Sequence, residues 1–172
     1  MSSVSFGFPP ISSISARVLI LGSLPGEVSL RRREYYAQPR NTFWKIMGEL
    51  FGIAPDLPYV TRVAALIEND VAVWDVCAAA HRPGSLDSSI RIASVEANDF
   101  NPFFSEHPRV SLICFNGAKA GAIYEARVLP KLGDSLRNLS RQVLPSTSPA
   151  HASVPYEAKI SAWKVVRQPV GS

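Results

Sequence analysis

Cysteines and long apolar runs, which mark several common protein classes, are scarce in this 172-residue sequence. Its two cysteines, Cys77 and Cys114, stand in or beside apolar runs, and neither has a pair of histidines nearby. That pattern excludes a zinc or iron–sulfur site and predicts two buried, reduced thiols. No apolar run reaches about 18 residues, so we expect no transmembrane helix and no membrane partner.

The N-terminal segment lacks the features of a secretory signal. Residues 1–15 contain no basic region followed by a continuous apolar region, so we expect no signal peptide and an intracellular, cytoplasmic location. This segment is rich in serine and proline, and we expect it to pack on the body of the protein through Phe6, Phe8 and Ile11. Residues 16–172 are then expected to form one domain.

The phosphate-binding and nucleophile motifs of common enzymes are also missing. The segment Gly22–Ser29 (GSLPGEVS) is neither a P-loop, because no Gly-Lys-Ser/Thr follows, nor a G-x-G-x-x-G fingerprint. Gly133–Leu136 spells the GDSL of a lipase family, but it stands late in the chain and no Asp-x-x-His follows to complete a triad. We expect no metal ion and no cofactor.

What is present is an ordinary globular composition with a basic balance. Hydrophobic residues make up 47% and charged residues 19% of the chain, and the net charge is +4. A basic protein can bind nucleic acid, although charge alone does not establish it. Arg31, Arg32 and Arg33 form the densest basic cluster, which is either a solvated surface or a contact for phosphates.

Apolar patterns predict short strands alternating with helices. The strands are expected over 16–21, 71–76, 110–115 and 142–144, and the helices over 41–51, 59–69, 98–106, 118–129 and 155–167. Residues 77–90 are predicted to form a long loop. Alternation of this kind favours parallel pairing through right-handed crossovers. We therefore predict an α/β fold with a central four-stranded parallel sheet and helices on both faces.

Polar groups follow each predicted strand. They lie in Gly22–Ser29 with Tyr36–Asn41, at Asp75, at Asn116, and in Ser146–His151. The carboxyl ends of parallel strands meet at one edge of a sheet, so these groups are expected to share one cleft. An aromatic ring, two amides and several hydroxyls suit a neutral heterocycle that is held by stacking and hydrogen bonds.

Four blocks of the sequence resemble the uracil-DNA glycosylase superfamily, most closely its hypoxanthine-DNA (DNA-deoxyinosine) glycosylase branch. They are G22-x-x-P25-G26-x-x-S29 with Y36-A-Q-P39-R-N41-T-F43-W44-K45, W74-D75-V76, G84-S85-L86-D87-S88, and P145-S146-T147-S148-P149-A150. The resemblance implies a three-layer α/β/α fold and a monofunctional DNA glycosylase of base excision repair. Such an enzyme flips a deaminated base out of DNA and hydrolyses its N-glycosidic bond. Hypoxanthine is the first expected substrate and uracil the second, and we expect a monomer whose partner is DNA containing a damaged base.

Leu24 departs from the pattern of the wider superfamily. The mismatch-specific branch has asparagine here, and the conventional uracil branch has aspartate nearby, to position or activate the attacking water. A leucine side chain cannot do this. In the hypoxanthine branch the important polar residue lies in the Asn-x-Phe-Trp block, which corresponds to Asn41.

The remaining roles follow from the same resemblance. It implies catalytic roles for Asn41 and Ser23, and contacts to the base from Tyr36, Asn116, Gly22 and Gly26. DNA contacts are implied for Ser29, Arg31, Ser146, Thr147, Ser148, Pro149 and His151. His151 does not take the leaving-group role of the histidine in the conventional uracil branch, because that histidine corresponds to Leu144.

Each role has a structural alternative. Asn41 could cap the helix that follows it, Tyr36 could be a core aromatic, and Asn116 and Ser146–Ser148 could simply form turns. Asp75 and Asp87 could orient loops or polarise a neighbouring group. Leu24 also leaves open a non-catalytic DNA- or nucleotide-binding module, and a small-molecule hydrolase would need an activated serine for which no His/Asp pair is evident.

Overall fold

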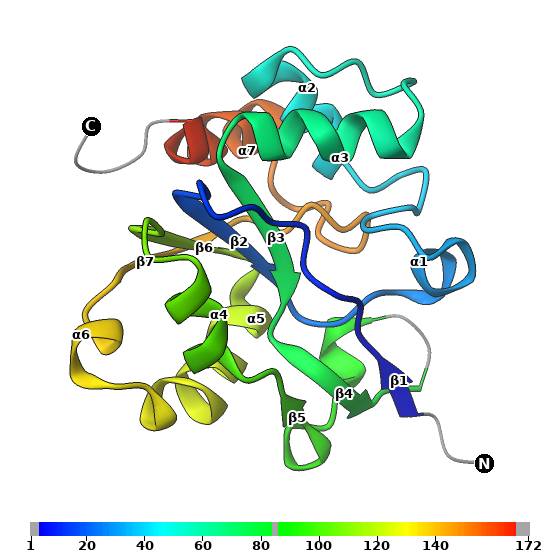
Figure 1. Cartoon of the computed structure of the whole chain (residues 1–172). Coiled ribbons are helices and arrows are strands. Elements are labelled where there is room, and N and C mark those ends of the chain that lie inside the picture. The colour runs from blue at the N-terminus through cyan, green and yellow to red at the C-terminus, as the bar shows by residue number, and fades with distance from the viewer. Residues whose placement is uncertain (1–3, 84–85, 168–172) are drawn as a thin grey trace.

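The computed structural model describes residues 4–83 and 86–167. Its main sheet has four parallel strands in the order β3 (Val71–Asp75), β2 (Val18–Gly22), β6 (Leu112–Asn116) and β7 (Ser140–Leu144). The sheet forms the centre of the molecule in Figure 1. The predicted four-stranded parallel sheet is confirmed, and each strand lies within two residues of its expected position.

Helices cover both faces of this sheet. Figure 1 shows α2 (Phe43–Phe51), α3 (Tyr59–Glu68) and α7 (Tyr156–Trp163) on one face, and α4 (Phe100–Glu106) and α5 (Ala118–Arg127) on the other. Two shorter helices, α1 (Glu27–Arg32) and α6 (Asp134–Arg137), lie in the connections. The three-layer arrangement follows because strands that are buried on both faces need apolar cover on each side.

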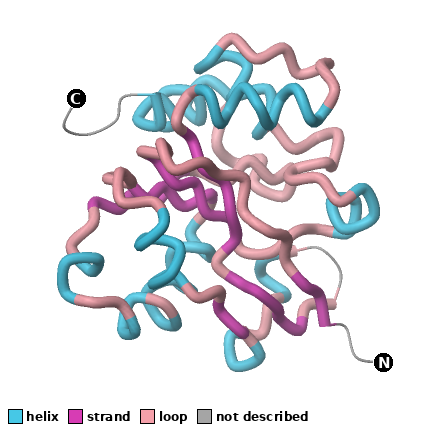
Figure 2. The backbone as a smooth tube through the Cα atoms, in the orientation of Figure 1, coloured by secondary structure: helices cyan, strands magenta, loops and turns pink. Residues whose placement is uncertain are grey.

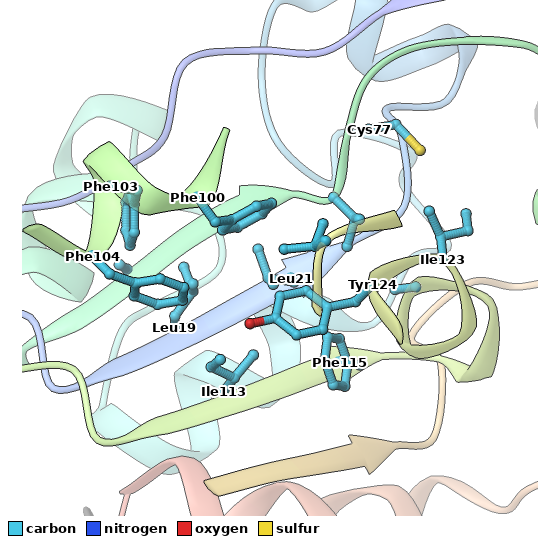
Figure 3. Packing of buried hydrophobic residues seen from close by; sticks show 14 of the residues in the cluster. Leu19, Leu21, Cys77, Phe100, Phe103, Phe104, Ile113, Phe115, Ile123 and Tyr124 are labelled. Atoms are coloured by element: carbon cyan, nitrogen blue, oxygen red, sulfur yellow. The ribbon is translucent and has the colours of Figure 1, made fainter. Parts of the chain in front are cut away.

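The two apolar cores divide according to the alternation of side chains along the strands. On β2, Val18 and Ile20 pack in the cluster with α2 and α7, whereas Leu19 and Leu21 pack in the cluster with α4 and α5. Figure 3 shows the second cluster, in which phenylalanines of α4 and Tyr124 of α5 lie over the strands. All four of these β2 side chains are at most 2% exposed.

All five predicted helices are present, but several of their ends differ from the prediction by one to four residues. Helix α2 begins at Phe43 rather than at Asn41, and it ends at Gly52, as predicted, where φ is +72°. The last helix ends at Trp163 and continues only as a 3₁₀ turn over Lys164–Arg167.

The prediction of a loop over residues 77–90 was wrong for its first part. Cys77–His81 forms β4, which pairs antiparallel with β1 (Val4–Phe6) and β5 (Glu96–Ala97) in a second, three-stranded sheet. Figure 2 shows this smaller group of strands beside the main sheet. The run Cys-Ala-Ala-Ala-His has little strand propensity of its own, so pairing with two distant segments makes it a strand. Gly84 and Ser85, part of the third resemblance block, lie outside the described residues.

The N-terminal segment packs on the body through some of the expected side chains. Ile11 is buried and exchanges two backbone hydrogen bonds with Val73, at 2.8 and 2.9 Å. Phe8 is partly buried, and its carbonyl accepts a hydrogen bond from Trp74 Nε1 at 3.0 Å. Phe6 is 65% exposed, so its expected packing role was wrong, because it lies on the edge strand β1.

Both cysteines are buried and unpaired, as predicted, and burial raises the pKa of each thiol to about 12. Across the described ranges, no helix is long and apolar enough to cross a membrane. Within the same ranges, no three His, Cys, Asp or Glu side chains gather as metal ligands would.

Candidate active site

A cavity of about 370 Å³ opens at the carboxyl edge of the main sheet. Gly22, Asp75, Asn116 and Ser146, which end or follow β2, β3, β6 and β7, all line it. The structure therefore gathers the four strand-end groups into one cavity, as predicted. Every proposed site residue lines this cavity except Arg31 and His151.

Gly22 is required by the close approach of two side chains. A Cβ atom at this position would lie 2.6 Å from Asp75 Oδ1 and 2.9 Å from the Tyr36 hydroxyl. Neither loop glycine has unusual backbone dihedrals. Gly22 has no positive φ, and Gly26 has ordinary extended dihedrals of −77° and 177° at the start of α1.

Asn41 bonds to the first backbone amide of α2 and also lines the cavity. Its Oδ1 accepts a hydrogen bond from the Phe43 amide at 2.9 Å, whereas the Thr42 side chain makes no capping bond. The prediction that Asn41 is the N-cap was therefore wrong by one residue: Thr42 is the N-cap, and Asn41 accepts from the first amide of α2 rather than from the second or third. Asn41 also lines the cavity, and its Nδ2 group donates to no other residue in the described ranges. The amide nitrogen is free to donate to a ligand.

Tyr36 combines a packing position with a place in the cavity wall. Its ring stacks on Phe43, with centroids 4.1 Å apart and planes 26° apart, and its backbone has a φ of +56°. The hydroxyl is buried without a hydrogen-bond partner among the described residues. Burial, and after it the charge of Asp75, raises the pKa of this phenol above its ordinary value, and the nearby Asn116 amide acts in the opposite direction.

Asn116 is held in one orientation by Thr147. Asn116 Nδ2 donates to Thr147 Oγ1 at 2.9 Å, and the Thr147 amide donates to Asn116 Oδ1 at 2.9 Å. The Thr147 carbonyl also accepts from the Thr42 amide at 3.0 Å. One buried residue thus joins the end of β6, the loop after β7 and the loop before α2.

The serines beside Thr147 shape the loop through its backbone. The Ser148 amide donates to Ser146 Oγ at 3.1 Å, and the Ala150 amide donates to Ser148 Oγ at 3.2 Å. Both hydroxyls thus accept bonds within a turn, as the structural alternative predicted. Each hydroxyl hydrogen can still donate to a ligand.

Ser23 and Asp87 form a pair that the sequence patterns did not reveal. The Ser23 hydroxyl donates to Asp87 Oδ1 at 2.5 Å, and both residues line the cavity. Burial raises the pKa of Asp87, and the Ser23 hydrogen bond and the charges of Arg82 and Lys119 act in the opposite direction.

Asp75 and Arg82 bring buried charge under the loop that follows β2. Asp75 is 3% exposed, and its Oδ2 has no partner among the described residues. Burial, and after it the charge of Asp87, raises the pKa of Asp75 to about 7. Arg82, 2% exposed, donates to the Leu24 carbonyl at 3.2 Å and to the Pro25 carbonyl. Arg82 was missed from the sequence, although a lone arginine after an Ala-rich apolar run was a usable signal.

Three of the predicted residues either hold a loop in place or lie outside the lining of this cavity. Ser29 is buried, and its hydroxyl accepts from the Ala37 amide at 3.1 Å, which holds the loop that carries Tyr36. Arg31 is exposed at the end of α1. His151 borders a neighbouring cavity with Lys119, and its carbonyl accepts from Lys159 Nζ at 2.7 Å.

Arg40 and Leu24 are two further residues of the cavity wall. Arg40, which had no role assigned from the sequence, is exposed and also lines the cavity. Leu24 is buried in the apolar core and contributes no polar atom from its side chain.

The fold is a three-layer α/β/α arrangement with a cavity at the carboxyl ends of its parallel strands, which is where open α/β sheets commonly bind ligands. Comparison with known proteins is more specific. Residues 9–167 match the uracil DNA glycosylase superfamily. The chain is 38% identical over 144 residues to a hypoxanthine DNA glycosylase of Methanosarcina acetivorans, an alignment that covers 78% of this chain and 90% of that protein. It is 40% identical over 116 residues to a hypoxanthine DNA glycosylase of Methanosarcina barkeri, which covers 67% of this chain and 72% of that protein.

A solved structure shares the fold. A candidate uracil DNA glycosylase from Methanosarcina acetivorans, determined in solution by NMR, superposes with a TM-score of 0.80 and 36% identity. The alignment covers 96% of this chain and 98% of that one. The chain belongs to the uracil DNA glycosylase superfamily, which confirms the resemblance drawn from the sequence blocks.

Proposed function

We propose that this protein is a monofunctional DNA glycosylase that removes hypoxanthine from DNA, with uracil as a second substrate. The observation that carries the proposal is the cavity in which Asn116, locked by Thr147, faces the same space as Tyr36 and Asn41. The names of the two Methanosarcina relatives support hypoxanthine as the first substrate.

A base must leave the DNA stack to enter a cavity of this kind. Tyr36, backed by Phe43, offers an aromatic wall, and stacking of a base on such a ring contributes about 1–3 kcal/mol. The Asn116 side chain uses one of its donor hydrogens and one of its acceptor sites in the two hydrogen bonds to Thr147. An amide has a second donor and a second acceptor site, so Asn116 can still read the edge of a base in a set orientation.

Hydrolysis breaks the bond between C1′ of the sugar and the base nitrogen, and negative charge grows on the leaving base. Asn41 Nδ2 and the second amide hydrogen of Asn116 are donors that can stabilise this charge or position a water molecule. Lysine is absent from the described residues that line the cavity, so nothing there offers an amine for a Schiff base with the sugar. The expected product is therefore an abasic site with an intact strand.

DNA contacts would come from the cavity rim. Ser146, Ser148 and Pro149 lie on the loop after β7, and Arg40 lies on the facing loop. Arg31 is exposed on α1, nine residues before Arg40 in the sequence, and it adds to the net positive charge of the chain. Cationic contacts of this kind make binding weaken as salt concentration rises, because phosphates release counterions.

The test is strand cleavage after alkali treatment of duplexes that carry one hypoxanthine, uracil or xanthine. Cleavage at hypoxanthine by the wild type, abolished in a folded Asn41→Ala variant, supports the proposal. Asn138→Ala is the matched control, because Asn138 is exposed and lies outside the cavity. Cleavage at uracil alone would overturn the substrate. Salt-sensitive binding without cleavage of any duplex would favour a non-catalytic DNA-binding module.

A further inference from the structure

Hydrolysis needs a group that takes a proton from the attacking water, and this inference rests on the proposed glycosylase activity. Asn41 is a poor candidate, because an amide is not a base and its oxygen already accepts from the Phe43 amide. The described carboxylates that line the cavity are Glu27, Asp75 and Asp87.

Two of these carboxylates are badly placed for the task. Glu27 is exposed to solvent as the first residue of α1. Asp75 is 3% exposed, and its Oδ2 is sealed from solvent without a partner among the described residues. Burial raises the pKa of Asp75 to about 7, so this carboxyl group binds its proton more tightly than an ordinary aspartate does.

Asp87 has the position and the surroundings of a base. Its side chain is only partly buried, and Oδ1 is held by the Ser23 hydroxyl at 2.5 Å. Ser23 stands between Gly22, where β2 ends, and the apolar Leu24. In the described ranges no protein group donates to the second oxygen, Oδ2. The pair therefore presents an acceptor oxygen inside the cavity, at the end of the central strand.

Burial raises the pKa of Asp87, and the groups around it act in the opposite direction. Arg82 and Lys119 contribute positive charge, and the Ser23 hydroxyl donates to the carboxylate. Asp75 is the like-charged neighbour, and it is more deeply buried and has no positive partner at its Oδ2 among the described residues. Two carboxyl groups whose environments separate their proton affinities are a common arrangement in acid–base catalysis.

We propose that the Asp87 carboxylate accepts a proton from the water that attacks the sugar, and that Ser23 holds this carboxylate in place. The water oxygen bonds to C1′ while one water O–H bond breaks, and that proton passes to Asp87. The C1′–N bond breaks with its electron pair going to the base, which leaves as an anion or takes a proton. Asp87 then returns its proton to solvent. No other reactant is required.

The first test is Asp87→Asn, which keeps the shape of the side chain and removes the base. Single-turnover release of hypoxanthine should fall by about 10²–10⁴-fold, the usual contribution of general base catalysis. Affinity for a hypoxanthine duplex should stay within a few-fold of the wild-type affinity. The acid limb of the pH–rate profile should disappear, because no carboxylate remains to be protonated. Asp56→Asn is the matched control, since Asp56 is exposed in a turn and does not line the cavity.

Two further variants separate a proton acceptor from a merely structural residue. Ser23→Ala removes the hydrogen bond that lowers the pKa of Asp87, so the acid limb should move to higher pH with a smaller loss of rate. Asp87→Ala should recover part of its rate when formate supplies a carboxylate in solution. If Asp87→Asn does not fold, the pH–rate profile of Ser23→Ala tests the role of Asp87 instead.

The outcomes distinguish this inference from the proposed function. An active wild type with an unchanged rate and pH profile in Asp87→Asn would overturn the role of Asp87 and leave the glycosylase intact. A Ser23→Ala variant with an unshifted acid limb would also overturn it. A wild type that releases no base from any duplex would overturn both proposals.

Discussion

Asn116 and Thr147 hold each other through two 2.9 Å hydrogen bonds at the end of the sheet, one in each direction. Both residues are at most 5% exposed, so water does not compete for these bonds. Because the Thr147 carbonyl also accepts from the Thr42 amide, three loops of the cavity meet at this threonine. Stability and ligand binding should therefore respond together to changes at Thr147.

Thr147→Val keeps the shape of the side chain and removes its hydroxyl. Asn116 Nδ2 then loses its partner in a buried site, so we expect a loss of about 1–3 kcal/mol in the free energy of unfolding. Affinity for hypoxanthine DNA should also fall, because the amide is no longer held in one orientation. Urea denaturation and a binding titration measure the two effects. Thr61→Val, at an exposed site on α3, should change stability by no more than about 0.5 kcal/mol. Equal effects at the two sites would contradict the anchoring role.

Gly22→Ala introduces a methyl group where Asp75 and Tyr36 already meet. The new carbon would lie 2.6 Å from Asp75 Oδ1, so overpacking should cost about 1–3 kcal/mol in urea denaturation. Gly133→Ala is the control, because its new methyl group would have no atom within 4 Å and the φ at this position is −64°. If Gly22→Ala were as stable as Gly133→Ala, the side chains around the end of β2 would be able to move aside for the methyl group at little cost, contrary to this prediction.

Tyr36→Phe and Tyr35→Phe should have opposite effects on stability. The Tyr36 hydroxyl is buried without a partner among the described residues, so its removal should leave stability unchanged or raise it by about 1 kcal/mol. The Tyr35 hydroxyl donates to the Pro9 carbonyl at 2.8 Å, and its loss should cost about 0.5–1.5 kcal/mol. Thermal unfolding of the two single variants gives the comparison. A clear destabilisation by Tyr36→Phe would mean that this hydroxyl has a partner in solution.

Asp75→Asn should alter the pH dependence of stability. The native pKa of Asp75, about 7, lies above its ordinary value of 3.8, so the native state binds the proton more tightly than the unfolded state. The Asp75 contribution therefore favours the native state below pH 3.8 and is lost as pH rises toward 7. Asparagine has no such dependence. From pH 4 to pH 8, the stability of Asp75→Asn relative to wild type should rise by up to about 4 kcal/mol. Urea denaturation at both pH values, with Asp56→Asn as the control, tests this, and a constant difference would contradict the raised pKa.

Local patterns in the sequence were sufficient for most of the fold. The continuous apolar run at Ala16–Leu21 predicted β2, and Gly52 predicted the end of α2, because both signals come from residues adjacent in the chain. Strand β4 was missed for the opposite reason. Its residues, Cys77–His81, become a strand through pairing with β1, more than 70 residues earlier in the chain.

The candidate site also has features that the sequence predicted and features that it did not. The positions of Asp75, Asn116 and Ser146 at one edge follow from parallel pairing alone, so the sequence predicted that they would share a cavity. The sequence did not predict that Asn41 Oδ1 would accept a hydrogen bond from the Phe43 amide while Nδ2 remained available to a ligand. That division depends on where α2 begins.

The sequence by itself determined the four parallel strands of the main sheet, the five longer helices and the residue types at the carboxyl edge of that sheet. The physical reason is that apolar periodicity and turn residues act over a few neighbouring positions. The tertiary structure alone decided which polar groups satisfy one another and which face the cavity. Ser23 meets Asp87 across 64 residues of chain, and Arg82 reaches the Leu24 carbonyl across 58. Hydrogen bonds act over about 3 Å, so such pairs exist only once the core has placed both ends.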